Sequence, residues 1–172
     1  MLVHHSNIEA VGKNACSASL TLSGISDRVI SETLVLFSRL IQENQARILK
    51  ANSDDIELAR QNNTSMASID RLMLNEDRLN YLKTVMFDVA QQKSPVDRIL
   101  ETVTRPNGLQ IKKITTPIGV VGVIFESRPN VFCDAAALCM KSKNSAILKP
   151  GSDALKTVQS LYTVLVKALQ DK

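Results

Sequence analysis

The chain has 172 residues, of which 44% are hydrophobic and 22% charged, a composition typical of a globular protein with one sizeable core. No apolar run approaches the length of a membrane-spanning helix, and the N-terminus lacks a basic and apolar leader pattern, so we expect neither a membrane partner nor secretion. The three cysteines form no CxxC pair, which favours a reducing, cytoplasmic location over a disulfide framework.

Charge is divided unevenly along the chain. Residues 105–172 carry ten lysines and arginines against four acidic residues, whereas residues 1–104 are slightly acidic. A basic half is compatible with nucleic acid, but aromatic residues make up only 3% and no basic cluster extends beyond Lys112-Lys113. We therefore expect no nucleic-acid partner. A phosphate-bearing small molecule fits the local excess better, and a solvated basic face explains the charge alone about equally well.

Helical patterns dominate the first hundred residues. Residues 1–24 are rich in Ala and Ser and carry a weak helical pattern. From Ser26 onward, apolar residues recur at helical spacing and predict a well-defined helix. Asn52 or Ser53 is expected to cap a second helix, because acidic residues follow in its first turn. Asn75 is expected to cap a third helix for the same reason.

The pattern changes to strands near Val103. An Arg-Pro-Asn-Gly turn precedes a predicted strand with two different faces, Leu109–Ile114. Two short apolar runs then follow, Val120–Phe125 and Ala146–Leu148, with a segment of helical length between them. Continuous apolar runs of this kind predict strands that are buried on both faces. A last helix is expected over residues 153–170. This order predicts an α/β fold, in which an N-terminal helical layer precedes the first half of a doubly wound, Rossmann-like parallel sheet.

A polar tip follows the first of these strands, and ligands of open α/β sheets bind beyond the carboxyl ends of the strands. This first tip is Glu126-Ser127-Arg128-Pro129-Asn130. Arg128 can bind a carboxylate or phosphate through two hydrogen bonds, and the amide of Asn130 can polarise a carbonyl oxygen. A turn with Arg128 in a structural salt bridge explains the same residues about equally well.

A second tip, Lys149-Pro150-Gly151-Ser152, joins the next strand to the last helix. Free backbone N–H groups at a helix start attract anions, and Lys149 and Ser152 would add a charge and a hydroxyl. The spacing matches neither the Walker A loop nor the GxGxxG motif. A serine that caps a helix near a lysine explains the same residues, because that combination is common.

The remaining reactive residue types do not form a recognisable catalytic group. Cys133 and Cys139 lie in apolar company on one predicted helix, which favours buried, unreactive thiols. His4 and His5 are the only histidines and both lie at the N-terminus. We therefore expect no metal site and no histidine-assisted nucleophile.

A resemblance to a known family rests on longer motifs. Residues 104–155, TRPNGLQIKKITTPIGVVGVIFESRPNVFCDAAALCMKSKNSAILKPGSDAL, closely resemble the γ-glutamyl phosphate reductases (glutamate-5-semialdehyde dehydrogenases), a divergent branch of the aldehyde dehydrogenase superfamily. RILKANSDDIELAR, SIDRLMLNEDRL and SPVDRILETVTRPNGL match that family's N-terminal helices in order and spacing. TRPNGL and ESRPNV are specific to this reductase, whereas the PxGVVGVI and LKP elements are shared across the superfamily. The resemblance implies an aldehyde dehydrogenase-like fold.

The resemblance also implies a reaction and its cofactor. Members of this family use NADPH to reduce the acyl phosphate L-glutamyl 5-phosphate to glutamate 5-semialdehyde with release of phosphate, a step of proline biosynthesis. By that match, Lys149, Gly151 and Ser152 contact the adenosine side of NADP(H), and Glu126 and Ser127 line its groove.

The resemblance places the substrate at the first tip. Asn130 is the candidate donor to the oxyanion, with Arg128 as its rival, and Arg128 equally suits the carboxylate or phosphate of the substrate. The implied division of the chain is a helical layer over 1–104, part of an oligomerisation hairpin over 105–116, and half of the NADP(H)-binding domain over 117–172. A homo-oligomer and a functional link to glutamate 5-kinase are further implications.

The chain also departs from the family. Members are much longer, and Cys16, Cys133 and Cys139 do not fall in the motif of the family's catalytic cysteine. We therefore expect this chain to be inactive on its own. Two alternatives stay open: another aldehyde dehydrogenase relative, against which TRPNGL and ESRPNV argue, and a non-catalytic nucleotide-binding or interaction module, which an incomplete sheet with an open edge would favour.

Overall fold

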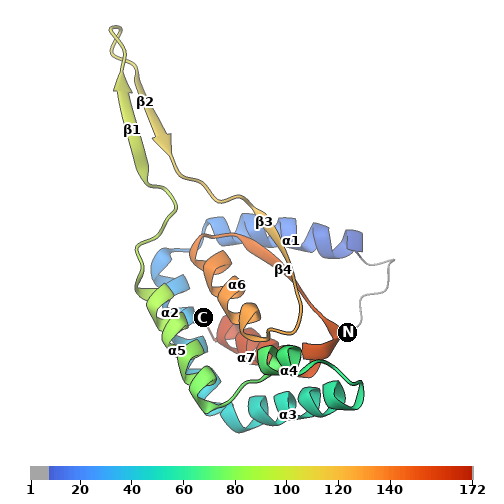
Figure 1. The fold of residues 1–172 in the computed structure, drawn as a ribbon. Coiled ribbons are helices and arrows are strands. Elements are labelled where there is room, and N and C mark those ends of the chain that lie inside the picture. The colour runs from blue at the N-terminus through green and yellow to red at the C-terminus, as the bar shows by residue number, and fades with distance from the viewer. Residues whose placement is uncertain (1–7, 172) are drawn as a thin grey trace.

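The computed structural model describes residues 8–171, in which a helical half precedes a half that contains the strands (Figure 1). The helical half consists of α1 (Ile8–Ser23), α2 (Asp27–Glu43), α3 (Gln45–Gln61), α4 (Met66–Leu72) and α5 (Glu76–Gln91). The second half consists of β1 (Ile99–Thr104), β2 (Gln110–Ile114), β3 (Val120–Phe125), α6 (Asn130–Lys141), β4 (Ser145–Pro150), the short 3₁₀ helix η2 (Ser152–Ala154) and α7 (Leu155–Gln170).

Helices α2 and α5 begin where the sequence predicts. The Ser26 side chain accepts a hydrogen bond from the backbone N–H of Val29 (3.3 Å), and the Asn75 side chain accepts one from Arg78 N–H (2.8 Å). Each cap satisfies one of the free N–H groups of a first helical turn. The two helices pack against each other through apolar faces that are fully buried, namely Ile30, Leu34, Phe37 and Ile41 on α2 and Leu79, Leu82 and Met86 on α5.

The helix start predicted at Asn52 or Ser53 is wrong. Helix α3 runs without interruption from Gln45 to Gln61, so both residues lie inside it. Asn52 is only 1% exposed, and its side chain bonds to segments distant in sequence rather than to its own helix. The tertiary partners of Asn52 therefore replace the local capping role that its residue type suggests.

Strands β1 and β2 form an antiparallel hairpin that extends away from the rest of the molecule (Figure 1). Gly108 has a φ of 84° and its N–H donates to Arg105 O (2.9 Å), as the predicted turn requires. Every residue of both strands is exposed. Strand β1 occupies the end of the range assigned above to the helical layer, so range 105–116 holds only the second strand. The division into domains stays a prediction.

Strands β3 and β4 pair in parallel, as predicted, with Val120 opposite Ser145 and Phe125 opposite Pro150. Helices α1 and α6 both pack against this pair. The expected burial of β3 on both faces is wrong, because only Phe125 is buried and Ile124 is 78% exposed. Helix α1 covers mainly β4, to which it is held by a hydrogen bond from the Ser145 hydroxyl to Ala15 O (2.8 Å).

The helical half and the strand half share one hydrophobic core. Helix α7 packs against α2 and α3, and α6 packs against α5. At this boundary Lys141, 3% exposed, forms an ion pair with Asp27 (2.9 Å) and donates to Ser31 Oγ (2.8 Å) and Ala90 O (3.2 Å). A buried ammonium is tolerated there because its donors all find partners.

Candidate functional site

The two polar tips predicted from the sequence lie side by side, beyond the carboxyl ends of the parallel strands β3 and β4. Phe125 and Pro150 are the last partners in the register of β3 and β4. One residue further, the backbone N–H of Gly151 donates to Phe125 O (2.8 Å). The segments that follow the two strands therefore start from the same place, which is where parallel sheets bind ligands.

Gly151 allows the two tips to approach each other closely. A Cβ atom at this position would lie 2.5 Å from Asp153 Oδ1 and 3.3 Å from Glu126 Cγ. The φ of Gly151 is −64°, which any residue can adopt, so space rather than backbone conformation favours glycine here. The missing side chain of Gly151 thus leaves room for Glu126 and Asp153 beside it.

A hydrogen bond between side chains links the tips a second time. Ser127 has a φ of 49°, in the left-handed region that non-glycine residues rarely occupy, and its hydroxyl donates to Asp153 Oδ2. Asp153 was not among the residues predicted for the site. Its only signal in the sequence is its place two residues after Gly151, which does not reveal a partner on the other tip.

The first turn of the last helix already has a protein carboxylate beside it, while the anion site predicted at the second tip itself stays a prediction. The helix begins at Leu155, after η2, and no side-chain cap comes from Ser152. Instead the carboxylate of Asp55, on α3, accepts hydrogen bonds from the N–H groups of Lys156 (3.3 Å) and Thr157 (2.8 Å). These donors are therefore already occupied by a protein anion. Lys149 and Ser152 are both exposed beside the tips, and their roles stay predictions.

Arg128 and Asn130 line a cavity of about 250 Å³ between the first tip and the α4–α5 segment. Asn130 is the first residue of α6, and its amide donates to Asp134 Oδ2 (3.3 Å). Burial raises the pKa of Asp134, and the hydrogen bond from Asn130 partly offsets that rise. Arg128 is exposed, and among residues 8–171 its side chain has no hydrogen-bond or ion-pair partner, so the alternative of a structural salt bridge finds no support there.

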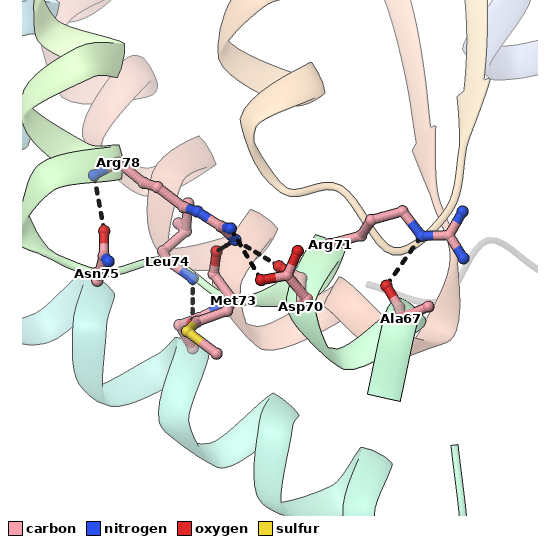
Figure 2. A network of polar contacts seen from close by, with 8 residues as sticks. Ala67, Asp70, Arg71, Met73, Leu74, Asn75 and Arg78 are labelled. Carbon is pink, nitrogen blue, oxygen red and sulfur yellow. Dashed lines mark hydrogen bonds and ion pairs between the residues drawn. The ribbon is translucent and has the colours of Figure 1, made fainter. Parts of the chain in front are cut away.

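The opposite wall of this cavity is held together by Arg78 (Figure 2). Its guanidinium forms an ion pair with Asp70 Oδ1 (3.0 Å) and donates to Met73 O (2.8 Å) and to Asp70 O. Arg78 thereby fastens the end of α4 to the start of α5. Arg71 lies on the same wall, where its Nε donates to Ala67 O (3.2 Å).

The two cysteines on α6, Cys133 and Cys139, are buried, as the sequence predicts for unreactive thiols. Cys133 is fully buried, and burial raises its pKa far above the usual range, with a further rise from the nearby Asp134 carboxylate. Burial also raises the pKa of Cys139. Cys16 is exposed on α1. His4 and His5 lie outside the described residues.

Residues 8–171 contain neither a cluster of metal ligands nor a membrane-spanning helix. Within that range His, Cys, Asp and Glu side chains do not gather in threes in a way that would hold a metal ion. No helix in the described part of the chain is long and apolar enough to cross a membrane.

Comparison with solved structures defines the class of fold. A probable aldehyde dehydrogenase from Listeria monocytogenes superposes with a TM-score of 0.68 at 13% identity, over 96% of this chain and 34% of that chain. At that level of identity the likeness concerns the fold alone. The molecule therefore has the fold of the N-terminal part of an aldehyde dehydrogenase, as expected.

Closer similarities, at 30% identity or more, are to γ-glutamyl phosphate reductases. γ-Glutamyl phosphate reductases from Saccharomyces cerevisiae and Thermotoga maritima superpose with TM-scores of 0.93 and 0.90 at 30% and 31% identity, and cover 98% and 93% of this chain. Curated γ-glutamyl phosphate reductases from Bartonella henselae and Zymomonas mobilis are 40% and 42% identical over 160 and 159 residues. The chain is thus a homologue of γ-glutamyl phosphate reductase over nearly all of its own length.

The match covers only part of each relative. The chain spans 39% of the Bartonella protein and 37% of the Zymomonas protein, and 43% and 39% of the yeast and Thermotoga structures. No family model matches the chain. The similarity therefore concerns the helical layer, the hairpin and the start of the parallel sheet.

Proposed function

We propose that this chain forms the helical layer and the first half of the cofactor domain of a γ-glutamyl phosphate reductase. The proposed reaction is the NADPH-dependent reduction of L-glutamyl 5-phosphate to glutamate 5-semialdehyde, with release of phosphate, in proline biosynthesis. The family relationship supports the reaction. The single observation that carries the proposal is the joining of the two polar tips at one edge of the sheet by Gly151.

The residues at this edge suit a dinucleotide. Lys149 supplies an exposed ammonium for phosphate or ribose oxygens, and Ser152 an exposed hydroxyl. Gly151 lets Glu126 and Asp153 lie close to its backbone, and Glu126 and Ser127 would form the side of the groove on the first tip. When bound, NADP(H) would supply the hydride, and these residues would position it.

The proposed substrate site is the cavity beside the first tip. Arg128 offers a guanidinium that has no partner within residues 8–171, and its planar fork suits the carboxylate or phosphate of the acyl phosphate. The amide of Asn130 has a second N–H besides the one donated to Asp134, and a donor there would stabilise a developing oxyanion. Arg128 stays the rival for that role, because both residues line the same cavity.

We further propose that the protein is a cytoplasmic homo-oligomer that acts together with glutamate 5-kinase. The hairpin supports self-association, because a ribbon exposed on both faces carries apolar side chains such as Ile99, Ile111 and Ile114. The kinase link rests on the chemistry of the substrate, since an acyl phosphate is short-lived in water and is best passed on quickly.

Binding of NADPH and NADH to the purified chain, measured by fluorescence titration, tests the cofactor proposal. We expect NADPH to bind more tightly, and Lys149→Ala to weaken that binding about tenfold, the value of one charge-assisted contact of roughly 1.5 kcal/mol. Lys113→Ala, on the distant hairpin, is the matched control and should change nothing. Failure of both dinucleotides to bind would overturn the proposal.

Turnover is a separate measurement. Reduction of glutamyl phosphate by the purified chain, followed by loss of NADPH absorbance, tests the expectation that the chain alone is inactive. Measurable turnover would contradict that expectation while supporting the proposed reaction.

A further inference from the structure

The cavity beside the first tip is built from two parts of the chain that lie far apart in sequence. Arg128 and Asn130 come from the loop and helix after β3, whereas Arg71, Arg78 and Tyr81 come from α4 and α5. We propose that Arg71 is a second anion-binding arginine of this cavity, and that it holds an oxyanion of the substrate together with Arg128. This inference rests on the proposed function of the site.

Positive charge is concentrated around this cavity. Three arginines line it against a single carboxylate, that of Asp70. Asp70 is already paired with Arg78 at 3.0 Å, so within the described part of the chain the charges of Arg71 and Arg128 are not compensated by a carboxylate that lines the cavity. A cleft lined by one sign of charge attracts small ions of the opposite sign. A bound oxyanion would supply negative charge beside these two guanidinium groups.

The three arginines differ in how many of their donors are free. Arg78 is committed to the wall, because it donates to two backbone carbonyls and pairs with Asp70. Arg71 is held by Nε to Ala67 O (3.2 Å) and by one terminal nitrogen to Ser68 Oγ (3.3 Å), which leaves its other terminal nitrogen available. Figure 2 shows Arg71 and Arg78 extending on opposite sides of Asp70.

The size and lining of the cavity indicate what it can hold. A volume of about 250 Å³ accommodates a short-chain acid. Met73 and Tyr81 offer apolar surface that suits a short methylene chain between charged ends. The ligand class is therefore a short aliphatic acid that presents an oxyanion, either its carboxylate or its phosphate, to the two arginines.

The test uses the full chain and two probes, glutarate for the carboxylate and inorganic phosphate for the phosphate. Each is titrated while the arginine side-chain N–H signals are followed by NMR. We expect saturable binding in the millimolar range for at least one probe, with shifts at Arg71 Nε, and the probe that binds more tightly identifies which oxyanion the cavity takes. Arg71→Ala and Arg128→Ala should each weaken binding about tenfold. Arg71→Lys should restore part of the affinity, because charge returns without the planar fork.

Arg105→Ala, in the hairpin turn, is the control for general loss of positive charge and should leave the affinity unchanged. The inference is overturned if neither probe saturates at millimolar concentration, or if Arg71→Ala binds as well as the original chain.

Binding of NADPH separates this inference from the proposed function. We expect Arg71→Ala to leave the NADPH affinity unchanged, since Lys149, Gly151 and Ser152, which are proposed to bind that cofactor, do not line this cavity. If NADPH binds but neither probe does, the inference fails while the proposed function stands. An equal loss of NADPH affinity in Arg71→Ala would assign the cavity to the cofactor and overturn the inference.

Discussion

The carboxylate of Asp55 closes the first turn of a helix that begins one hundred residues later in the chain. Its Oδ2 accepts hydrogen bonds from the backbone N–H (2.8 Å) and the hydroxyl (2.7 Å) of Thr157 on α7. Both residues are buried, and Thr157 also accepts a hydrogen bond from the Asn52 amide (3.2 Å). The helical layer thus supplies the cap that α7 lacks in its own sequence.

Replacement of Asp55 by alanine should lower the free energy of unfolding by about 3 kcal/mol, because a buried helix start loses charge-assisted hydrogen bonds. Urea unfolding followed by circular dichroism measures the change. Asp54→Ala is the matched control: this neighbour pairs with Lys50 at the surface, and we expect little effect. Equal losses in the two variants would show that the buried contact with Thr157 is not the source of the stability.

Gly151→Ala should disturb the junction of the two tips. The added Cβ would force the Asp153 carboxylate to turn away and so release the Ser127 hydroxyl. We expect a loss of about 1–2 kcal/mol in unfolding free energy and weaker NADPH binding.

Gly122→Ala provides the control for that substitution. Gly122 lies in β3, where a Cβ would meet nothing within 4 Å, so this variant should be as stable as the original chain. If both alanine variants behave alike, crowding at Gly151 is not what favours glycine there.

The cysteines should differ widely in their reaction with a thiol reagent. The thiolate is the reactive form, and burial raises the pKa of both Cys133 and Cys139. At mildly alkaline pH we expect only Cys16, which is exposed, to react quickly with dithiobisnitrobenzoate, with the other two following on unfolding. Rapid reaction of Cys133 in the native protein would contradict its burial, and Cys16→Ser identifies the fast phase.

Asp134 should make the protein less stable as pH rises. Burial raises its pKa in the folded chain, so between the ordinary carboxyl pKa and the raised one the folded state binds more protons than the unfolded state. Its contribution is therefore lost as pH rises through that window. Asp134→Asn should melt at a higher temperature than the original chain at neutral pH, and the difference should shrink towards pH 4. A difference that does not depend on pH would contradict this account.

Much of the fold follows from local sequence patterns. The apolar periodicity after Ser26 and the cap at Asn75 predict α2 and α5, and the apolar runs around residues 120–125 and 146–148 predict the parallel pair. These elements can be predicted because a helix cap joins residues that are close in sequence, and because an apolar run or face is visible in the order of the residues. They fail at Asn52, where the residue type suggests a cap but the partners are Leu72, Leu74 and Thr157.

The sequence predicts part of the candidate site, namely the two polar tips, but not all of the residues that line it. Both tips follow from the rule that ligands bind beyond the ends of parallel strands, and the structure brings them together. The contact of Asp153 with Ser127 depends on the register of the two strands, and the position of Arg71 opposite Arg128 depends on how α4 packs. Neither is encoded in the spacing of residues along the chain.

The buried Lys141 has a consequence for how this molecule unfolds. It belongs to the strand half, yet its ammonium is satisfied entirely by Asp27, Ser31 and Ala90 of the helical half. Separation of the halves would break this buried ion pair and expose to water the apolar core that the two halves share, so a state with only one half folded is costly. Calorimetry should accordingly record one cooperative transition, with the calorimetric and van't Hoff enthalpies equal, rather than two successive ones.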